Sequence, residues 1–452
     1  MTKDLRRLGA TAALLLLTAC GDEQSVPTPP PEPALAPAPA TPVDEQGDEE
    51  PEQGSPTEGE TPAAALAPET AAALEAMGYL PSAPTDNPED RGVTENAPDA
   101  HPGVNLYSTR HRASASLITM DGRVLHEWQV PEADDSPTRW MHVEPLPNGD
   151  ILALTLGDSV TRHAWDSSVV WRRDIPAHHD LAVHTDGRIY VLVRWAEHHS
   201  FRPATFRNGQ LPVLADGITI LGADGERERR VELLPLMEPH LDTSRLERIH
   251  ARVEAGSTAG LVRGGGLGDL LHTNSIAFLH REIEGVAPAG SVLLSFRNIS
   301  RVAILSAALD EVLWVWGRGE LQGQHDATQL ENGRLLIFDN GSRRNASRAI
   351  EVDATTNEIG WTYEADDFFT ELRGGAQRLP NGNTLITESD RGRAAEVTTA
   401  GEVVWEFWNP DVRNTAEGPE RGVIYRLNRF PASAFPRLAQ GQTAATPSTD
   451  EP

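Results

Sequence analysis

Residues 323–344, GQHDATQLENGRLLIFDNGSRR, are the stretch of sequence that decides the fold. The stretch predicts a strand that begins at His325, a tight turn at Asn332 and Gly333, and a buried return strand over residues 335–338. Asn-Gly between two β-rich runs favours a type I′ hairpin, in which both central residues have positive φ. His325 therefore occupies the first position of a strand, seven residues before the turn.

Two kinds of segment recur from residue 104 onward. One is an apolar strand that follows a turn and contains a tryptophan in five of its six copies, at residues 121–128, 166–174, 223–233, 309–317, 356–364 and 400–408. The other is a hairpin like that around Asn332, at residues 146–155, 184–193, 290–298, 330–339 and 379–388, with a degenerate sixth copy at 105–120.

A repeat of short strands with a period of about 40–60 residues is typical of a β-propeller, because a single four-stranded blade cannot bury its faces alone. We therefore expect an all-β fold, a six-bladed β-propeller over residues 101–435. The irregular spacing before residue 290 predicts a long insertion, from Leu236 to Gly268, over one face of the ring. Two packed β-sandwiches are the alternative, and they fit the period less well.

The N-terminus has the features of a lipoprotein signal peptide. Basic residues precede an apolar run over residues 10–17, which leads into Leu-Thr-Ala-Cys ending at Cys20. The run has about ten residues, whereas a membrane-spanning helix needs about 20. We expect residues 1–20 to be the signal peptide and Cys20 to be lipidated, which would hold the protein outside the cytoplasm on the periplasmic face of a bacterial membrane. The sequence does not decide between the inner and the outer membrane.

Residues 21–100 are rich in Pro, Ala and Glu and predict a disordered tether. They contain 18 acidic residues against one arginine, so most of the formal net charge of −28 lies in this stretch. Residues 436–452 are expected to form a disordered tail. A net-negative chain without a basic stripe argues against nucleic acid as a partner. Cys20 is the only cysteine, so the chain has no internal disulfide.

The first strand of each propeller blade lines the central channel. At the position seven residues before the turn, the blades offer His325, His179, Gly374 and Met141, and the two histidines are followed by Asp326 and Asp180. The blade with the insertion offers His272 and Asn274, and its return strand ends in Ser295-Phe296-Arg297-Asn298. We expect these three histidines, the asparagine and the arginine to converge on one axis, and the glycine blade to leave space for a ligand.

A single histidine before a hairpin is most often structural, but three at equivalent positions of a repeat indicate a functional site. Arg297 is predicted on an otherwise apolar strand, where a buried guanidinium needs an oxyanion partner. The sequence leaves open whether Asp180 and Asp326 cap turns or orient the neighbouring imidazoles. No metal is expected, because the chain has no H-E-x-x-H spacing and the arginine would repel a cation. The remaining candidates are expected to be peripheral: His178, His198, His199 and Arg343.

Over residues 105–410 the chain is similar to the bacterial arylsulfotransferase family, which transfers sulfuryl groups without a nucleotide sulfate donor. The motifs that carry the resemblance are HHDLAV (178–183), LHTNSI (271–276), SFRN (295–298), GQHDAT (323–328), FDNG (338–341) and GGAQRLPNGNTLI (374–386). The resemblance implies a six-bladed propeller and no cofactor. It also implies that His325 is the nucleophile that transiently carries the sulfuryl group, and that His179, His272, Asn274 and Arg297 are the other matched site residues.

The implied reaction is a ping-pong transfer from an aryl sulfate to a phenolic acceptor. His325 would attack sulfur, while Arg297, His179 and Asn274 hold the sulfuryl oxygens, as fixed charges do in phosphoryl transfer. His272 would protonate the departing phenoxide and later deprotonate the acceptor. A nucleotide cradle is not expected, because the chain has no Walker-type Gly-Lys motif.

Two other functions remain open from the sequence. The first is a membrane-tethered propeller that binds an anionic ligand or a protein partner without chemistry. The second is hydrolysis of sulfate esters at the same site, with water as the acceptor. The natural donor and acceptor, and the choice between a monomer and a homodimer, are not decided by the residues.

Overall fold

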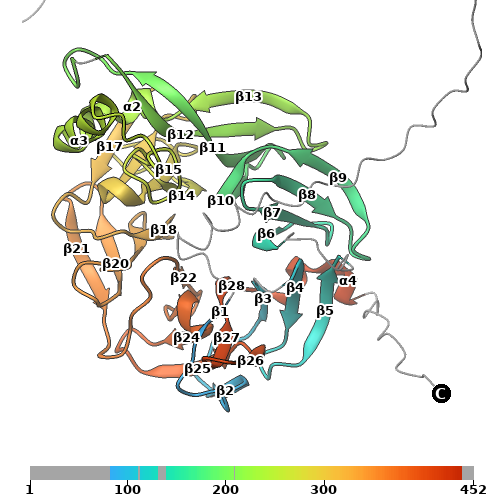
Figure 1. The fold of residues 1–452 in the computed structure, drawn as a ribbon. Helices are drawn as coiled ribbons and strands as arrows, with labels where there is room; N and C mark the ends of the chain where they lie inside the picture. Colours follow the sequence, from blue (N-terminus) through green and yellow to red (C-terminus); the bar gives the residue numbers. More distant parts are fainter. Residues whose placement is uncertain (1–81, 110–111, 131–138, 208, 440–452) are drawn as a thin grey trace, which may run out of the picture. The chain divides into compact units, whose positions relative to one another are not determined.

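The computed structural model describes residues 82–109, 112–130, 139–207 and 209–439. These residues belong to one compact unit, Pro62–Pro452. The fold is all-β and propeller-like: Figure 1 shows the larger antiparallel sheets of this unit arranged around a central axis. No helix in the described ranges is long and apolar enough to cross a membrane. The expected signal peptide, Cys20 and most of the expected tether lie outside the described residues.

Six sheets have four or five strands each, and they follow one another along the chain. The first three are β28(Ile424–Phe430)-β3(Val104–Thr109)-β4(Ser114–Ile118)-β5(Val124–Gln129), β6(Trp140–Pro145)-β7(Ile151–Thr155)-β8(Ser159–His163)-β9(Val169–Asp174) and β10(Ala177–Val183)-β11(Ile189–Ser200)-β12(Gln210–Leu221)-β13(Arg227–Glu232). The next three are β14(Thr273–Phe278)-β15(Val292–Phe296)-β16(Arg301–Leu305)-β17(Val312–Trp316), β18(His325–Gln329)-β19(Leu335–Asp339)-β20(Arg348–Asp353)-β21(Glu358–Tyr363) and β22(Gly375–Arg378)-β23(Thr384–Glu388)-β24(Arg393–Val397)-β25(Val403–Trp408)-β2(Gly92–Asn96). A smaller sheet has the order β1(Ser82–Pro84)-β27(Gly418–Gly422)-β26(Val412–Thr415).

The innermost strands form a closed ring. In order around the axis they are β28, β6, β10, β14, β18 and β22, and each contacts the next, with β22 contacting β28. β28 comes from the C-terminal end of the chain and pairs with β3, so one sheet joins the two ends of the ring. The six recurring apolar segments of the sequence form β5, β9, β13, β17, β21 and β25, which lie farthest from the axis in their sheets apart from the added edge strand β2.

The core lies between neighbouring sheets. Leu293 and Ile304 of one sheet, for example, pack with Leu335 and Ile337 of the next, and all four side chains are fully buried. The second strands of several sheets are therefore largely apolar, as in ILALT of β7, VLLSF of β15 and LLIFD of β19, since both of their faces are covered. Burial of each such side chain contributes roughly 1.5–3 kcal/mol, so the stacking of sheets holds the inner strands in place.

The hairpin turns differ from the prediction in their geometry. Gly333 has a positive φ of 86°, but Asn332 does not, so the predicted type I′ turn at this position is wrong. The Asn332 side chain instead accepts a hydrogen bond from the Arg334 amide at 3.0 Å. A glycine in the left-handed region closes the turn, and the asparagine serves as a local acceptor. The same pattern occurs at three other hairpins, with Asn148 and Gly149, Asp186 and Gly187, and Asn381 and Gly382.

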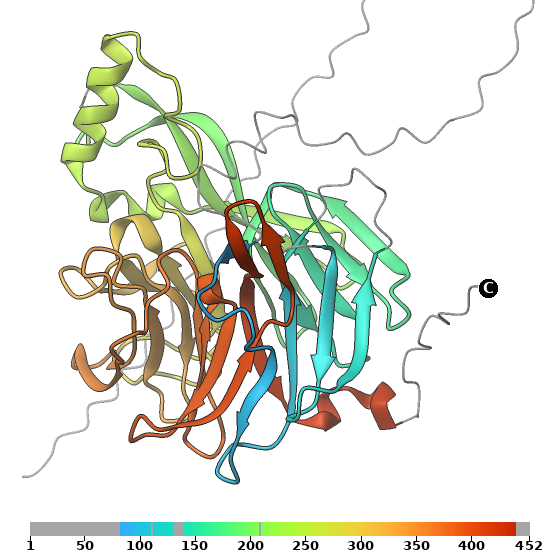
Figure 2. The same ribbon diagram turned by 60° about the horizontal axis from the view of Figure 1, so that its bottom comes forward.

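The expected insertion and tether contain ordered elements. The insertion forms α2(Leu234–Met237), the short η1(Glu238–His240) and α3(Thr243–Glu254), and Figure 2 shows α3 beyond the ends of the strands on one side of the ring. Leu246 and Ile249 bury the apolar side of α3 against the neighbouring sheet. Within the segment 21–100, expected to be a tether, residues 82–84 and 92–96 form β1 and β2. The expected tail begins with the short helix α4(Pro436–Ala439).

Candidate active site

The inner strands are irregular where the candidate residues lie. The pairing register shifts between Ala177 and Leu181 in β10, between Thr273 and Ser275 in β14, and between His325 and Ala327 in β18. Such bulges re-aim the side chains of a strand. Next to them, three residues that are not glycine have positive φ: His179 at 59°, His272 at 51° and Asp326 at 45°. Each such conformation costs of the order of 1–3 kcal/mol and is typical of functional sites.

The structure brings the three expected histidines together. The ring centroids of His179 and His272 are 4.8 Å apart, and those of His179 and His325 are 6.4 Å apart. The Nε2 atoms of His272 and His179 lie 3.3 Å from each other. All three side chains are buried, and burial lowers the pKa of each imidazole. The cluster is therefore a group of neutral imidazoles at neutral pH.

Asn340 fixes the tautomer of His325. The Asn340 amide nitrogen donates to the carbonyls of Thr370 at 2.8 Å and Arg373 at 2.6 Å, which directs its Oδ1 atom toward His325. Oδ1 can only accept a hydrogen bond, so the Nδ1 atom of His325, at 2.7 Å, carries the proton, and the Gly323 carbonyl is a second, more distant acceptor at 3.2 Å. The Nε2 atom is then an unprotonated nitrogen with a lone pair, and it is buried without a hydrogen-bond partner among the described residues. FDNG contains Asn340, but its role was not assigned from the sequence.

His272 has an acidic partner that the sequence analysis missed. The Asp269 carboxylate accepts from Nδ1 of His272 at 2.6 Å, and the Asp216 carboxylate accepts from its backbone amide at 3.1 Å. Asp269 also accepts from Arg194 at 3.3 Å, and both carboxylates are fully buried. His272 and Arg194 keep the pKa of Asp269 below its usual range, although burial opposes them, whereas burial raises the pKa of Asp216 to about 7. Asp269 therefore orients His272 and leaves its Nε2 atom directed toward His179.

His178 is part of the cluster, so its expected peripheral position is wrong. Its Nδ1 atom lies 2.8 Å from Nδ1 of His179, and only 1% of the residue is exposed. The reason is the bulge in β10, which leaves residues 178–180 without regular partners on β11. His198 and His199 lie farther along β11, where His199 bonds to Glu197 and Glu238.

Asn274 and Arg297 border the cluster in different ways. The Asn274 amide donates to the Gln324 carbonyl at 2.8 Å, and its Oδ1 atom is buried without a partner. Arg297 was expected on a strand, but it is the first residue of the short η2(Arg297–Ile299), which follows β15. Its side chain is half-buried. Its backbone amide donates to the His272 carbonyl at 3.1 Å, and its guanidinium donates to Asn298 at 3.1 Å. The positive charge of Arg297 is the second cause, after burial, of the lowered pKa of His325.

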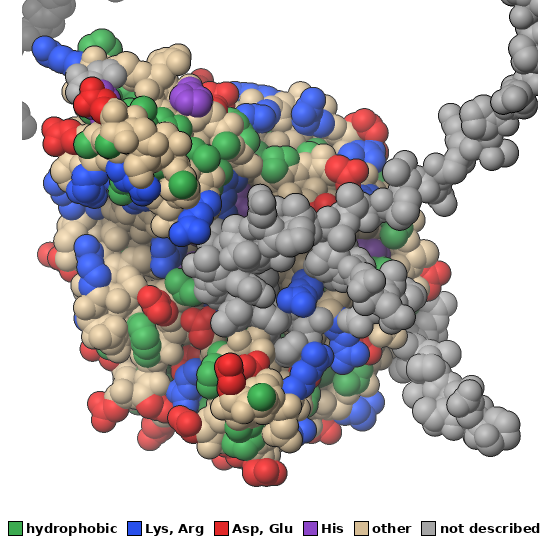
Figure 3. All heavy atoms as spheres, viewed as in Figure 1, with side chains coloured by type: hydrophobic (Ala, Val, Ile, Leu, Met, Phe, Trp, Pro, Cys, Tyr) green, Lys and Arg blue, Asp and Glu red, His purple; other side chains and the backbone are tan. Residues whose placement is uncertain are grey.

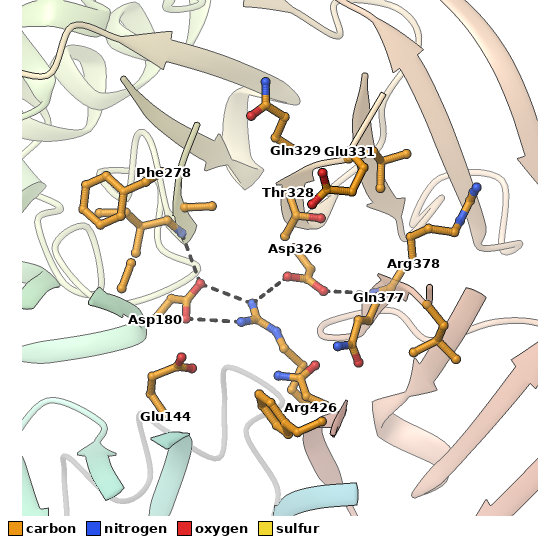
Figure 4. Close-up of a pocket in the computed structure, with 18 of the residues that line it drawn as sticks. Glu144, Asp180, Phe278, Asp326, Thr328, Gln329, Glu331, Gln377, Arg378 and Arg426 are labelled. Carbon is orange, nitrogen blue, oxygen red and sulfur yellow. Dashed lines mark hydrogen bonds and ion pairs between the residues drawn. The ribbon is translucent and has the colours of Figure 1, made fainter. Parts of the chain in front are cut away.

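Asp180 and Asp326 join neighbouring sheets. The Asp180 carboxylate accepts from the Ile276 amide at 3.1 Å, and that of Asp326 accepts from the Ala376 amide at 2.9 Å. Figure 4 shows Arg426 of β28 between the two carboxylates, 3.2 Å from Asp180 and 3.4 Å from Asp326. Of the two roles left open, neither turn capping nor orientation of the adjacent imidazoles is their main one. With Arg426 they tie five inner strands together, β10, β14, β18, β22 and β28.

A cavity of about 900 Å³ is bordered by this ion-pair network, and none of the three clustered histidines, His179, His272 and His325, is among its lining residues. Its walls come from the later residues of the inner strands, including Phe278, Thr328 and Gln377. The expected space beside Gly374 is absent, because a Cβ atom at this position would clash with the Phe338 ring. The glycine therefore permits close packing of Phe338, which corrects the expectation that it leaves room for a ligand.

Comparison with known proteins assigns the family. Residues 142–410, more than half of the chain, match the model of the arylsulfotransferase (ASST) family. The chain therefore belongs to the arylsulfotransferase family, and aryl sulfates and phenols are the donors and acceptors that this membership implies. The search of curated proteins gave no match.

Solved structures resemble the chain only weakly. A protein of unknown function from Bacteroides caccae has 15% identity and a TM-score of 0.47, over 73% of this chain and 99% of that one. A streptogramin B lyase has 13% identity and a TM-score of 0.41, over 77% and 97% of the two chains. The virginiamycin B lyase of Staphylococcus aureus has 11% identity and a TM-score of 0.39, over 71% and 86%. At these scores the likenesses support no conclusion about activity, and the assignment rests on the family match.

Proposed function

We propose that the protein is a nucleotide-independent aryl-sulfate sulfotransferase that works through a sulfohistidine at His325. The observation that carries the proposal is the buried, unpartnered Nε2 atom of His325, on a ring whose Nδ1 proton is held by Asn340. A neutral imidazole with a free lone pair is a nucleophile, and membership of the arylsulfotransferase family supplies the class of electrophile.

In the first half-reaction, Nε2 of His325 attacks the sulfur of an aryl sulfate. The N–S bond forms as the ester S–O bond breaks, and the phenoxide leaves with the electron pair of that bond. In the second half-reaction, the oxygen of a phenolic acceptor attacks the sulfur, the N–S bond breaks, and its electron pair returns to Nε2. His325 keeps its Nδ1 proton throughout, so the hydrogen bond to Asn340 persists in both steps.

His272 exchanges the proton. Burial makes this imidazole neutral in the empty site, but a sulfate monoanion beside it favours the charged form. The protonated ring can then donate from Nε2 to the departing phenoxide, while Asp269 accepts from Nδ1. In the second half-reaction the neutral ring takes the proton of the acceptor phenol. This role requires the Asp269 carboxylate at Nδ1 of His272 and the bound sulfate ester near its Nε2 atom.

The sulfuryl oxygens need fixed donors, because negative charge spreads over them in the transition state. Arg297 provides a cation that forms no ion pair with a carboxylate of the described residues. Asn274 uses one amide hydrogen for the Gln324 carbonyl and has a second one for a ligand. His179 completes the set, since its Nε2 atom adjoins that of His272.

The proposal includes the setting of the enzyme. The ring of six larger sheets supports a six-bladed propeller over residues 101–435, with strands β1 and β2 added from the preceding segment. The signal-peptide pattern and Cys20 support a lipoprotein on the periplasmic face of a bacterial membrane, connected to the propeller by an acidic tether.

A chromogenic aryl sulfate, 4-nitrophenyl sulfate, tests the function with and without added phenol. We expect phenol to accelerate release of 4-nitrophenolate and to be recovered as phenyl sulfate. Release that phenol does not accelerate would indicate hydrolysis. Binding of the ester without release would indicate the non-catalytic propeller.

A further inference from the structure

A second cavity, of about 610 Å³, lies between the insertion and η2. Its lining is strongly basic and includes five arginines, Arg245, Arg248, Arg301, Arg318 and Arg343, which we call the arginine pocket. Asp242 is the one carboxylate that lines it. Figure 3 shows basic side chains gathered on this face beside α3. This concentration of positive charge occurs in a chain whose formal net charge is −28.

None of the five guanidinium groups forms an ion pair with a carboxylate of the described residues. Arg245 donates to the backbone carbonyls of Leu267 and Asp269, both at 2.8 Å, so it is a fixed wall of the pocket. Arg301 is buried, and its Nη1 atom bonds only to the carbonyls of Ile299 and Ser300. Burial, followed by the charge of Arg318, lowers the pKa of Arg301. A buried arginine with open donor groups, beside other cations, needs an oxyanion to offset the repulsion between the charges.

The arginine pocket shares a wall with the candidate active site. Asn298 lines the pocket, accepts from the Arg297 guanidinium at 3.1 Å and donates to the Asp269 carbonyl at 2.5 Å. Arg297 stands next to His272, and Asp269 orients that histidine. One asparagine therefore contacts both the sulfuryl-binding arginine and the support of the acid–base histidine. The histidine cluster and the arginine pocket are therefore separated by the side chain of Asn298 and its two partners.

We propose that the arginine pocket binds a second anionic group, a sulfonate, sulfate or carboxylate, on the substrate of the sulfotransferase. The inference rests on the proposed sulfuryl transfer and narrows its substrates to pairs in which one aromatic partner carries an anionic group besides the sulfate ester that is transferred. The second group can belong to the donor or to the acceptor. Arg318 and Arg343 provide exposed donors from the side of η2, and Arg301 provides the buried one.

The test compares neutral and anionic substrates. One arm uses 4-nitrophenyl sulfate with phenol, 4-hydroxybenzenesulfonate, 6-hydroxynaphthalene-2-sulfonate or 4′-hydroxybiphenyl-4-sulfonate as the acceptor. The other arm uses phenol with naphthyl sulfates that do or do not carry a second sulfonate. The variants are R318A, R343A and their double mutant. R123A is the matched control, since Arg123 lies on the turn before β5, away from both sites.

We expect kcat/KM for at least one sulfonated compound to exceed that of its neutral counterpart by about tenfold. One charge-assisted hydrogen bond to the sulfonate is enough for a difference of about this factor. The double mutant should lose this preference and keep its rate with neutral partners, whereas R123A should keep both. Equal rates for neutral and anionic compounds in the wild type would overturn the inference and leave the sulfotransferase intact. The inference would also be overturned if the double mutant lost kcat/KM equally for neutral and anionic compounds and the loss vanished in high salt. Such a result would indicate long-range electrostatic attraction of substrates and not a binding pocket.

Calorimetry separates the two proposals. Naphthalene-1,5-disulfonate is titrated into the full-length protein without any sulfate ester, so no turnover is needed. Binding that the double mutant weakens about tenfold, and R123A does not, supports the arginine pocket even if no aryl sulfate is turned over. The absence of binding, or binding equal in all variants, contradicts it whatever the transfer assay gives.

Discussion

The inner strands contribute two adjacent layers of side chains with opposite properties: a histidine layer, His179 and His325, and an aspartate layer, Asp180 and Asp326. On β10 and on β18 a histidine is followed by an aspartate, as His179-Asp180 and His325-Asp326. The aspartates accept hydrogen bonds from the next sheet and form ion pairs with Arg426. In the histidine layer, by contrast, Nε2 of His325 has no partner among the described residues. In each bulged His-Asp pair the aspartate thus links neighbouring sheets, while the histidine belongs to the proposed catalytic cluster.

The difference shows where a buried polar atom signals function. A protein interior normally satisfies its polar groups, and each exception needs an explanation. In the aspartate layer the polar groups are used to hold strands, which keeps the neighbouring histidines in left-handed or bulged conformations. In the histidine layer the Nε2 atom of His325 has no hydrogen-bond partner among the described residues, and it is the atom proposed to attack sulfur. Substitutions in either layer test this division of roles.

The largest effect is expected from H325N, which removes the nucleophile. Turnover of 4-nitrophenyl sulfate should fall by at least roughly a thousandfold, because the covalent route is lost. The thermal midpoint should change little, since Asn340 keeps its bonds to the Thr370 and Arg373 carbonyls. H198N, at a site on β11 away from the cluster, is the matched control and should retain full activity. An active H325N enzyme would end the assignment of the nucleophile.

The substitution R426M removes the ion pairs of Asp180 and Asp326 with Arg426 and leaves both carboxylates buried without this cation. Removal of one partner from a buried ion-pair network typically lowers the free energy of unfolding by about 3–5 kcal/mol. Urea unfolding measures the loss. R413M is the control, because Arg413 forms an exposed pair with Asp411 and its loss should change stability by about 1 kcal/mol or less. Similar stabilities of the two variants would contradict the structural role of the aspartate layer.

Asn340 tests the link between positioning and reactivity. N340A should lower kcat/KM for the donor by roughly tenfold to a hundredfold, since His325 loses the nearer of its two Nδ1 acceptors and keeps only the Gly323 carbonyl at 3.2 Å. Nitrogen NMR of the imidazole distinguishes this from a general structural defect. In the wild type we expect the proton of His325 on Nδ1, and in N340A a mixture of tautomers. An unchanged tautomer in N340A would show that Asn340 does not select it.

The pH profile follows from the lowered pKa of His325. The neutral form is the nucleophile, and burial together with Arg297 keeps its pKa well below 6.5. The acid limb of kcat/KM for the donor should therefore begin below pH 6.5. In N340D a carboxylate next to Nδ1 favours the imidazolium, so the limb should move to higher pH. A limb that stays in place, with the fold intact, would contradict the assignment of this limb to His325.

The smallest effect is expected from D269N, which weakens the orientation and basicity of His272. Loss of activity should be severalfold larger for phenyl sulfate than for 4-nitrophenyl sulfate, because the more basic phenoxide needs more protonation as it leaves. The ratio of the two rates is the measurement, and it cancels general losses of folded protein. An equal loss for both esters would assign Asp269 to stability alone.

The repeat made most of the fold predictable from the sequence. The apolar segments ending near tryptophan gave the outer strands, and the spacing of seven residues to each turn located His325 and His179 on inner strands. The turn type was wrong, because Asn332 acts through its side chain and only Gly333 has positive φ. Gly374 was misjudged for a related reason: the sequence does not show that Phe338 packs against it.

The supporting residues of the site were not predictable in the same way. Asp216 lies 56 positions before His272, on another sheet, and its role depends on packing between sheets. Asp269 is only three residues before His272, so its contact had a local signal, but it lies outside the hairpin repeat. Arg297 was predicted on a strand that ends one residue earlier, and the turn of η2 sets its position. The sequence thus predicted the site residues that belong to the repeat, but not the residues of other sheets that hydrogen-bond to them.

The central claim is that His325 carries the sulfuryl group, and intact-mass analysis tests it most directly. The purified protein is mixed briefly with 4-nitrophenyl sulfate in the absence of an acceptor. We predict an acid-labile gain of about 80 Da that maps to the peptide containing His325, disappears on addition of phenol and is absent from H325N. Rapid release of 4-nitrophenolate without any adduct, or an adduct that persists in H325N, would contradict the claim.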